Sequence, residues 1–286
     1  MKRIAFIGTG VMGGPMAINL LKAGFGVGVY TRTKEKAREA VSKGAVWHDD
    51  IPSCVEDAEA VITMVGYPKD VEEVYFGAGG IIENAPAGAY LIDMTTTSPA
   101  LSRRIYDAAK KRGLHALDAP VSGGDIGANN ATLSIMAGGD EEDFKACGEI
   151  FSALGKTAVY QGGAGSGQHT KMANQIAIAG TIAAVCEAIT YAKAAGLSAE
   201  SVLSSIGGGA AGSFQMTNMG PKMLSGDFGP GFYLKHFIKD MRIAAEESKK
   251  NGAELGVLKY VLSMYERLSD EGMDDMGTQA LIKYYE

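Results

Sequence analysis

The sequence predicts an α/β protein in which a Rossmann-type domain with a mostly parallel sheet is followed by an all-helical domain. Two observations lead to this expectation. In the first half of the chain, short apolar runs alternate with helical patterns, which is typical of βαβ units. The strand signal then stops at the glycine-rich stretch "GGAGSGQ". The 286 residues suffice for two domains, which we place at 1–163 and 164–286.

Seven apolar runs bounded by turn residues predict strands, and the segments between them carry helical spacing. The predicted strands are 3–8, 26–31, 60–66, 89–94, 114–120, 133–139 and 157–161. An Ala-rich segment over about 166–195 predicts one helix, roughly 45 Å long, that joins the domains. Further helices are expected at 198–206, 239–252, 256–272 and 278–285. The stretch 205–218 fits either a loop between helices or the border of a substrate pocket.

Composition excludes several classes of function. The net charge of −6 and the pI near 5.4 disfavour nucleic acid as a partner. The three cysteines have no metal-ligand or disulfide spacing, so no metal is expected. No targeting segment is expected, and the apolar run Met172–Cys186 is short for a membrane span. We therefore expect a cytoplasmic protein with no membrane partner, and the apolar helical half favours a homo-oligomer.

Gly8, Gly10 and Gly13 stand in GxGxxG register directly after the first strand and open a helix. In this context the pattern is typical of dinucleotide binding. Gly8 allows a tight turn, Gly10 the close approach of a pyrophosphate, and Gly13 close packing of helix on sheet. The alternative is a strand–turn–helix with glycines that serve packing alone.

The end of the second strand indicates which dinucleotide binds. An NAD site usually has an acidic residue about 20 residues beyond the glycines. Here the chain reads Thr31-Arg32-Thr33 instead. A guanidinium beside hydroxyls suits a 2′-phosphate, so we expect NADP, with NAD also possible. The alternative is that Arg32 is a solvated charge and that NAD binds without an acidic partner.

Lys171 is the only charged residue between Lys156 and Glu187, among Ala, Gly and Ile. An ammonium in such surroundings must be paired or functional. On a helix, Lys171, Asn174 and Gln175 share one face and offer an ammonium and two amides. Reduction of a carbonyl needs a proton donor at the oxygen, which Lys171 could supply. A structural lysine that reaches solvent is the alternative.

Several longer motifs together resemble the β-hydroxyacid dehydrogenases, the family of 3-hydroxyisobutyrate dehydrogenase and tartronate semialdehyde reductase. The resemblance covers essentially the whole chain. It rests on "FIGTGVMGGPMAINLLKAG", "LIDMTTTSP", "DAPVSGG", "GAGSGQHTKMANQ" and "FYLKHFIKDM".

The resemblance implies a role for each matching residue. Lys171 matches the catalytic lysine. The residues that match the substrate site are Ser122, Gly123, Gly124, Asn174, Gln175 and Lys239. With the phosphate loop and the end of the second strand, the expected cofactor-binding residues are Gly8, Thr9, Gly10, Val11, Met12, Gly13, Thr31, Arg32, Thr33, Met64, Val65, Thr96 and Lys239. Without the resemblance, Lys239 would more often be a solvated surface lysine.

These observations predict an NADP-preferring oxidoreductase that interconverts short semialdehyde acids and 3-hydroxy acids. "KMANQ" resembles the tartronate semialdehyde reductases (2-hydroxy-3-oxopropionate reductases) most. A 3-hydroxyisobutyrate dehydrogenase and a reductase of glyoxylate or succinic semialdehyde are alternatives within the class. A non-catalytic dinucleotide-binding module is the alternative from another class, but it would predict loss of Lys171 or of the "SGG" loop.

Overall fold

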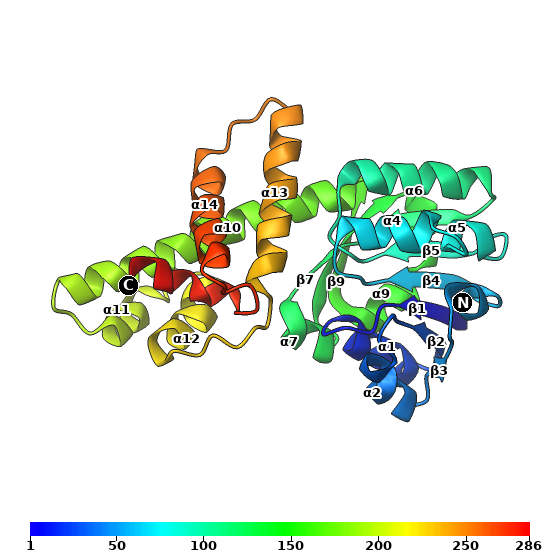
Figure 1. Ribbon diagram of the computed structural model, residues 1–286, viewed down its shortest axis with the longest axis horizontal. Coiled ribbons are helices and arrows are strands. Elements are labelled where there is room, and N and C mark those ends of the chain that lie inside the picture. The colour runs from blue at the N-terminus through cyan, green and yellow to red at the C-terminus, as the bar shows by residue number, and fades with distance from the viewer. The chain divides into compact units, whose positions relative to one another are not determined.

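The computed structural model describes residues 1–286, which form two compact units, Met1–Lys171 and Met172–Glu286. The first unit is an α/β unit built on a mostly parallel sheet, and the second is helical (Figure 1). The predicted fold class is therefore confirmed. The helix α10 (Ser166–Ala194) begins in the first unit and continues into the second.

The sheet of the first unit has nine strands in the order β3-β2-β1-β4-β5-β6-β8-β7, with β9 paired to β8. The order from β3 to β6 is that of dinucleotide-binding sheets. The strands are β1 (Arg3–Ile7), β2 (Gly26–Tyr30), β3 (Val46–Trp47), β4 (Ala60–Thr63), β5 (Tyr90–Asp93), β6 (His115–Asp118), β7 (Val121–Ser122), β8 (Leu133–Gly139) and β9 (Gly155–Gly162). Pairing is parallel except where β8 meets β6 and β7. All seven predicted strands are present, and the two-residue strands β3 and β7 are additional.

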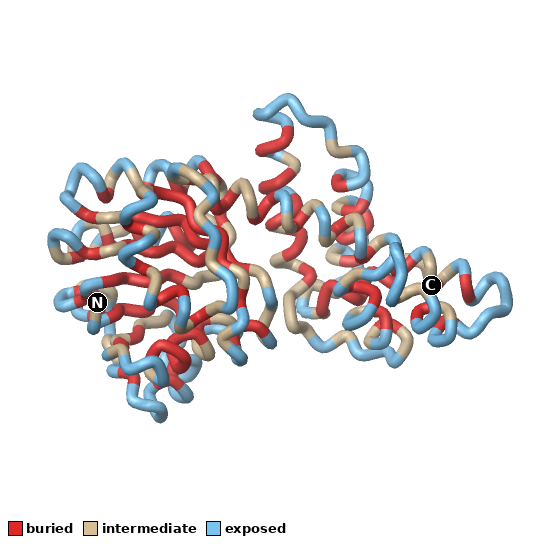
Figure 2. The backbone as a smooth tube through the Cα atoms, turned by 180° about the vertical axis from the view of Figure 1, so that it is seen from behind, coloured by how far each residue is buried: buried red, intermediate tan, exposed pale blue.

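Helices cover both faces of this sheet, because the side chains of a strand alternate between two hydrophobic cores. Ile4 and Phe6 of β1 belong to one core, and Ala5 and Ile7 to the other. The first core includes residues of α1 (Gly13–Lys22), α2 (Arg38–Ser42), α7 (Gly124–Asn129) and α9 (Gly148–Leu154). The second includes residues of α3 (Ile51–Val55), α4 (Pro68–Phe76), α5 (Ile81–Asn84) and α6 (Pro99–Lys111). Buried residues follow the central strands in Figure 2.

The second unit contains short and long helices around the C-terminal part of α10. They are α11 (Ala199–Ile206), a π-helix (Gln215–Met219), α12 (Gly220–Ser225), α13 (Leu234–Lys250), α14 (Gly256–Asp270) and a 3-10 helix (Thr278–Tyr285). Of the two alternatives for 205–218, the loop does not hold at its end, because the π-helix begins at Gln215 and runs directly into α12. Met216 of the π-helix and Met223 of α12 are buried. Helix α13 starts before the predicted residue 239, since Leu234 and Phe237 are buried.

Helix α10 is long and apolar enough, by length and composition, to cross a membrane. A core helix of a globular unit meets the same criteria. Residues of α10 such as Ile182, Val185 and Ile189 lie in the hydrophobic core of the helical unit. In the described structure this helix therefore supplies the core of its own unit.

Candidate active site

The glycines of the phosphate loop differ in what the fold requires of them. Gly8 has a φ of +99°, and a Cβ there would lie 2.3 Å from the carbonyl oxygen of Met64. A Cβ on Gly13 would lie 1.9 Å from the carbonyl oxygen of Gly8. A Cβ on Gly10, by contrast, would meet nothing within 4 Å. The fold thus requires glycine at positions 8 and 13. At position 10, in contrast, the space that a side chain would enter is open.

This open space fits the pyrophosphate of a dinucleotide. It lies at the turn between β1 and the N-terminus of α1, where unpaired N–H groups favour an anion. The hydroxyl oxygen of Thr9 is buried without a hydrogen-bond partner, and Val11 is an apolar residue that is 50% exposed. A ligand in the turn would satisfy the hydroxyl and cover the valine. The residues present therefore fit the cofactor that the sequence predicts.

Arg32 follows β2 and is held by Asp70, a residue that no sequence motif indicates. Its Nη1 lies 3.0 Å from Oδ1 of Asp70, whose side chain is buried while the arginine is 70% exposed. The second carboxylate oxygen of Asp70 accepts the N–H of Tyr67 at 3.0 Å, at the start of α4. Asp70 therefore fixes the guanidinium beside the end of β2. The only local signal was its place in the first turn of a helix after Tyr67-Pro68.

Three polar side chains end the neighbouring strands β4, β5 and β6, and they lie side by side in the register of the sheet. Thr63 pairs with Asp93, and Asp93 with Asp118. Oδ1 of Asp93 accepts the hydroxyl of Thr63 at 2.7 Å and the N–H of Thr95 at 3.1 Å, whereas Oδ2 has no partner. Burial raises the pKa of Asp93 to about 6. This carboxyl group thus supports the turn that leads to Thr96.

Asp118 holds the start of α10. Its two oxygens accept the backbone N–H groups of Gly165 at 2.7 Å and Gln168 at 2.8 Å. Burial raises the pKa of Asp118 to about 6, although these N–H groups oppose the shift. The carboxyl group satisfies donors that a helix leaves unpaired at its N-terminus. It therefore anchors the helix that carries Lys171 to the end of β6.

Lys171 is 7% exposed, and its Nζ donates to the carbonyl oxygen of Val121 at 2.8 Å. Val121 directly precedes the predicted substrate loop of Ser122, Gly123 and Gly124. Gly123 and Gly124 have φ values of +132° and +62°, which residues other than glycine rarely adopt. The structure thus brings Lys171 to the "SGG" loop across 50 residues of sequence. The backbone of this loop is turned as only glycines readily allow.

Thr96 lies between two residues that hydrogen-bond to α10. Thr95 and Thr97 are buried, and both contact the side-chain amide of Gln168. Met64 and Val65 follow β4, and the N–H of Val65 donates to the hydroxyl of Thr95 at 3.0 Å. Thr95 therefore connects the two segments of the first unit that carry the predicted cofactor residues Met64, Val65 and Thr96.

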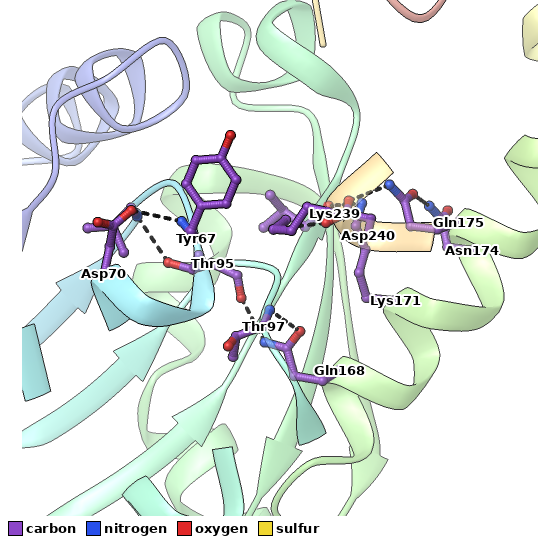
Figure 3. A network of polar contacts seen from close by, with 12 residues as sticks. Tyr67, Asp70, Thr95, Thr97, Gln168, Lys171, Asn174, Gln175, Lys239 and Asp240 are labelled. Carbon is purple, nitrogen blue, oxygen red and sulfur yellow. Dashed lines mark hydrogen bonds and ion pairs between the residues drawn. The ribbon is translucent and has the colours of Figure 1, made fainter. Parts of the chain in front are cut away.

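In the helical unit, Asn174, Gln175 and Lys239 form a chain of polar contacts with Asp240 (Figure 3). Nδ2 of Asn174 donates to Oε1 of Gln175 at 2.7 Å, and Nε2 of Gln175 donates to Oδ2 of Asp240 at 2.6 Å. Nζ of Lys239 lies 2.9 Å from Oδ1 of Asp240, and the lysine side chain is only 12% exposed. Lys239 is thus not a solvated surface lysine. Asp240, next to it in "KDM", was not identified from the sequence.

Comparison with known proteins places this site in a class. The NAD-binding domain of 6-phosphogluconate dehydrogenase matches residues 3–163. The NAD-binding domain of NADP-dependent 3-hydroxyisobutyrate dehydrogenase matches residues 165–285. The fold, the glycine turn and these matches define a nicotinamide-dinucleotide-dependent oxidoreductase that acts on CH–OH groups.

Individual relatives narrow the class to a family. The chain is 57% identical to an uncharacterised oxidoreductase of Bacillus subtilis, covering 99% of both chains. It is 36% identical to 2-hydroxy-3-oxopropionate reductase of Escherichia coli, covering 99% of this chain and 97% of that one. The structure of Mycobacterium tuberculosis 3-hydroxyisobutyrate dehydrogenase with L-serine superposes with a TM-score of 0.89 at 30% identity, covering 99% and 98%. The protein belongs to the β-hydroxyacid dehydrogenase family.

Proposed function

We propose that this enzyme interconverts short semialdehyde acids and 3-hydroxy acids and prefers NADP as its cofactor. Among the candidate substrates we rank tartronate semialdehyde first. The observation that carries the proposal is the buried ammonium of Lys171, held 2.8 Å from the carbonyl oxygen of Val121 at the edge of the "SGG" loop. A buried cation next to a glycine loop suits a small substrate with a carboxylate and a nearby carbonyl group.

Each group has a chemical task in this proposal. The hydroxyl of Ser122 and the backbone N–H groups of Gly123 and Gly124 bind the substrate carboxylate. Thr96 would hold the nicotinamide end of the cofactor, which when bound would exchange a hydride with the carbonyl carbon. Negative charge then develops on the carbonyl oxygen, and the ammonium of Lys171 donates a proton to it. In the oxidation direction the neutral amine accepts the proton of the alcohol.

The remaining substrate residues act through their amides and charge. Asn174 and Gln175 lie one helical turn beyond Lys171 on α10, so they share its face of that helix. We propose that Asn174 hydrogen-bonds the substrate and that Gln175 orients Asn174. Lys239, fixed by Asp240, supplies a second positive charge for substrate and cofactor.

The preference for NADP rests on Arg32. Asp70 forms an ion pair with Nη1 of the Arg32 guanidinium, and the arginine side chain is mostly exposed. The exposed N–H donors of the guanidinium can form charge-assisted hydrogen bonds with a 2′-phosphate. The rest of the predicted cofactor contacts, Gly8 to Gly13, Thr31, Thr33, Met64 and Val65, belong to the same proposal. Cytoplasmic location and homo-oligomeric assembly stay predictions from the sequence.

Among alternative substrates, 3-hydroxyisobutyrate is favoured by the match over residues 165–285 and by the relative of Mycobacterium tuberculosis. The identity to the reductase of Escherichia coli and the "KMANQ" segment favour tartronate semialdehyde. Glyoxylate and succinic semialdehyde are further candidate substrates. The purified enzyme should be assayed for reduction of the candidate aldehydes and for oxidation of 3-hydroxyisobutyrate and the other corresponding alcohols, with both cofactors.

Lys171→Ala tests the proposed chemistry. The variant should lose kcat by ~100-fold or more, the usual scale for a positioned acid–base group, while NADPH still binds. Lys171→Arg should rescue little, because guanidinium stays charged and has a different shape. Lys193→Ala, which removes an exposed lysine from the last turn of the same helix, is the matched control. A folded Lys171→Ala enzyme with near-normal kcat would reduce Lys171 to a structural role.

A further inference from the structure

Gln168 is fully buried, and its side chain bridges two segments that are distant in the sequence. Its Nε2 donates to the carbonyl oxygen of Thr95 at 2.7 Å, and its Oε1 accepts the N–H of Thr97 at 3.0 Å (Figure 3). One amide group thus holds the backbone on both sides of Thr96. These contacts span 73 and 71 residues of sequence.

The same residue is fixed from the other side. Its backbone N–H donates to Asp118 at 2.8 Å, which ties the first turn of α10 to the end of β6. Lys171 is three residues further along α10, so it lies on the next turn of the same helix face. Gln168 therefore connects the turn that carries Thr96 with the helical turn that carries Lys171.

Packing alone does not account for a glutamine at this position. Burying an amide is unfavourable unless its groups find partners, and leucine would fill a similar volume without that cost. The amide here both donates and accepts, to carbonyl and N–H groups two residues apart, as a neighbouring strand would. This pairing restricts the backbone of Thr96 directly, which a leucine could not do.

We propose that Gln168 is a positioning residue for hydride transfer, fixing the nicotinamide contact of Thr96 relative to the proton donor Lys171. This inference rests on the proposed roles of Thr96 and Lys171. Because Gln168 is fully buried, we assign it no contact with substrate or cofactor. Its loss should therefore disturb the chemical step much more than the binding of either ligand.

Gln168→Leu tests this separation. We expect kcat to fall by roughly 10- to 100-fold, the scale of a small misplacement at a reacting centre. The KM for the aldehyde and the Kd for NADPH should change by less than about threefold, the size of a minor contact change. The primary isotope effect on kcat with NADPH deuterated at the transferred position should increase, since hydride transfer becomes slower relative to the other steps.

Gln279→Leu is the matched control. This glutamine is also buried, and its Nε2 donates to the carbonyl oxygens of Asp227 and Gly229 at 2.9 Å each. Its loss should lower Tm without raising the isotope effect. If Gln279→Leu with a similar loss of Tm reproduces the kinetic change of Gln168→Leu, the role of Gln168 is structural and the proposal fails. A Gln168→Leu enzyme with kcat within twofold of the unmodified one overturns it as well.

Gln168→Glu provides a readout that does not depend on the leucine variant folding. An ionised glutamate still accepts from Thr97 but cannot donate to Thr95, whereas a protonated one can do both. The kcat of this variant, divided by that of the unmodified enzyme, should rise as the pH falls. A flat ratio contradicts the proposal. The proposed function is tested separately, by aldehyde reduction in the unmodified enzyme and its loss in Lys171→Ala. If those results hold and the ratio is flat, only the role of Gln168 is refuted.

Discussion

The two glycines Gly8 and Gly10, two residues apart in one turn, should respond oppositely to the same substitution. At Gly8 an alanine would keep a φ of +99°, and its Cβ would lie 2.3 Å from the carbonyl oxygen of Met64. A positive φ alone costs about 1–2 kcal/mol for an L-residue, and the backbone contact adds to it. For a chain of this size, about 2–4 °C of Tm per kcal/mol gives a loss of roughly 5 °C or more.

At Gly10 an alanine meets no protein atom within 4 Å, and the residue does not have a positive φ. The folded state tolerates the methyl group, and the unfolded chain loses freedom, so stability should rise by about 0.4–1 kcal/mol. The methyl group would, however, occupy the space that the pyrophosphate needs. Losing one hydrogen bond to a charged group, about 1.5–3 kcal/mol, weakens NADPH binding roughly 10- to 100-fold.

The assay combines thermal unfolding of the ligand-free protein with a fluorescence titration of NADPH for both variants. Gly8→Ala should unfold early, and Gly10→Ala should keep or raise its Tm while it binds NADPH weakly. Normal NADPH affinity in Gly10→Ala would show that the open space is not the pyrophosphate site. A large loss of Tm in that variant would show that the turn is packed differently.

Three further changes test separate parts of the site. Arg32→Asp should reverse the order of kcat/KM for NADPH and NADH, because a phosphate contact is replaced by repulsion; equal values for both cofactors in the unmodified enzyme would contradict the preference. Ser122→Ala should raise the KM for the acid substrate about tenfold, the effect of one hydrogen bond to a charge, without changing the Kd for NADPH; a parallel loss of NADPH binding would move this loop to the cofactor site. Burial raises the pKa of Asp93 to about 6, so the folded state holds this proton more tightly than the unfolded chain. The contribution of Asp93 to the unfolding free energy should fall by about 2 kcal/mol between pH 4 and pH 6. Asp93→Asn should remove this pH dependence in urea titrations, and an unchanged slope would refute the assignment.

The sequence predicted the sheet well because its strands are apolar runs bounded by glycine and other turn residues. It missed β3 and β7, since two residues such as Val46-Trp47 or Val121-Ser122 show no periodicity. It also missed the π-helix at Gln215–Met219, because the preceding glycines and the polar residues favoured a loop. In each case the tertiary contacts, not the local pattern, determine the structure.

In the candidate site, too, the residues in local motifs were predicted, and the residues that support them from distant segments were not. Local motifs identified the phosphate loop, Lys171 and the "SGG" loop, which all lie within short stretches of sequence. The residues that hold them were not identified, because Asp70 meets Arg32, and Gln168 meets Thr95, only after the sheet has formed. A glutamine in "GSGQHTK" carries no local sign of its partners. Contacts between distant segments cannot be derived from one sequence by periodicity or motif.

The row formed by Thr63, Asp93 and Asp118 shows how the fold supports the site. Burying two carboxyl groups at the ends of adjacent strands raises the pKa of both, so their ionised forms lower stability near neutral pH. Apolar residues at these positions would avoid this loss of stability but could not accept hydrogen bonds. Asp93 holds the N–H of Thr95, and Asp118 holds the N–H groups that open α10. Since the segments that follow carry the proposed site residues Thr96 and Lys171, we infer that stability is exchanged here for a fixed placement of these two residues.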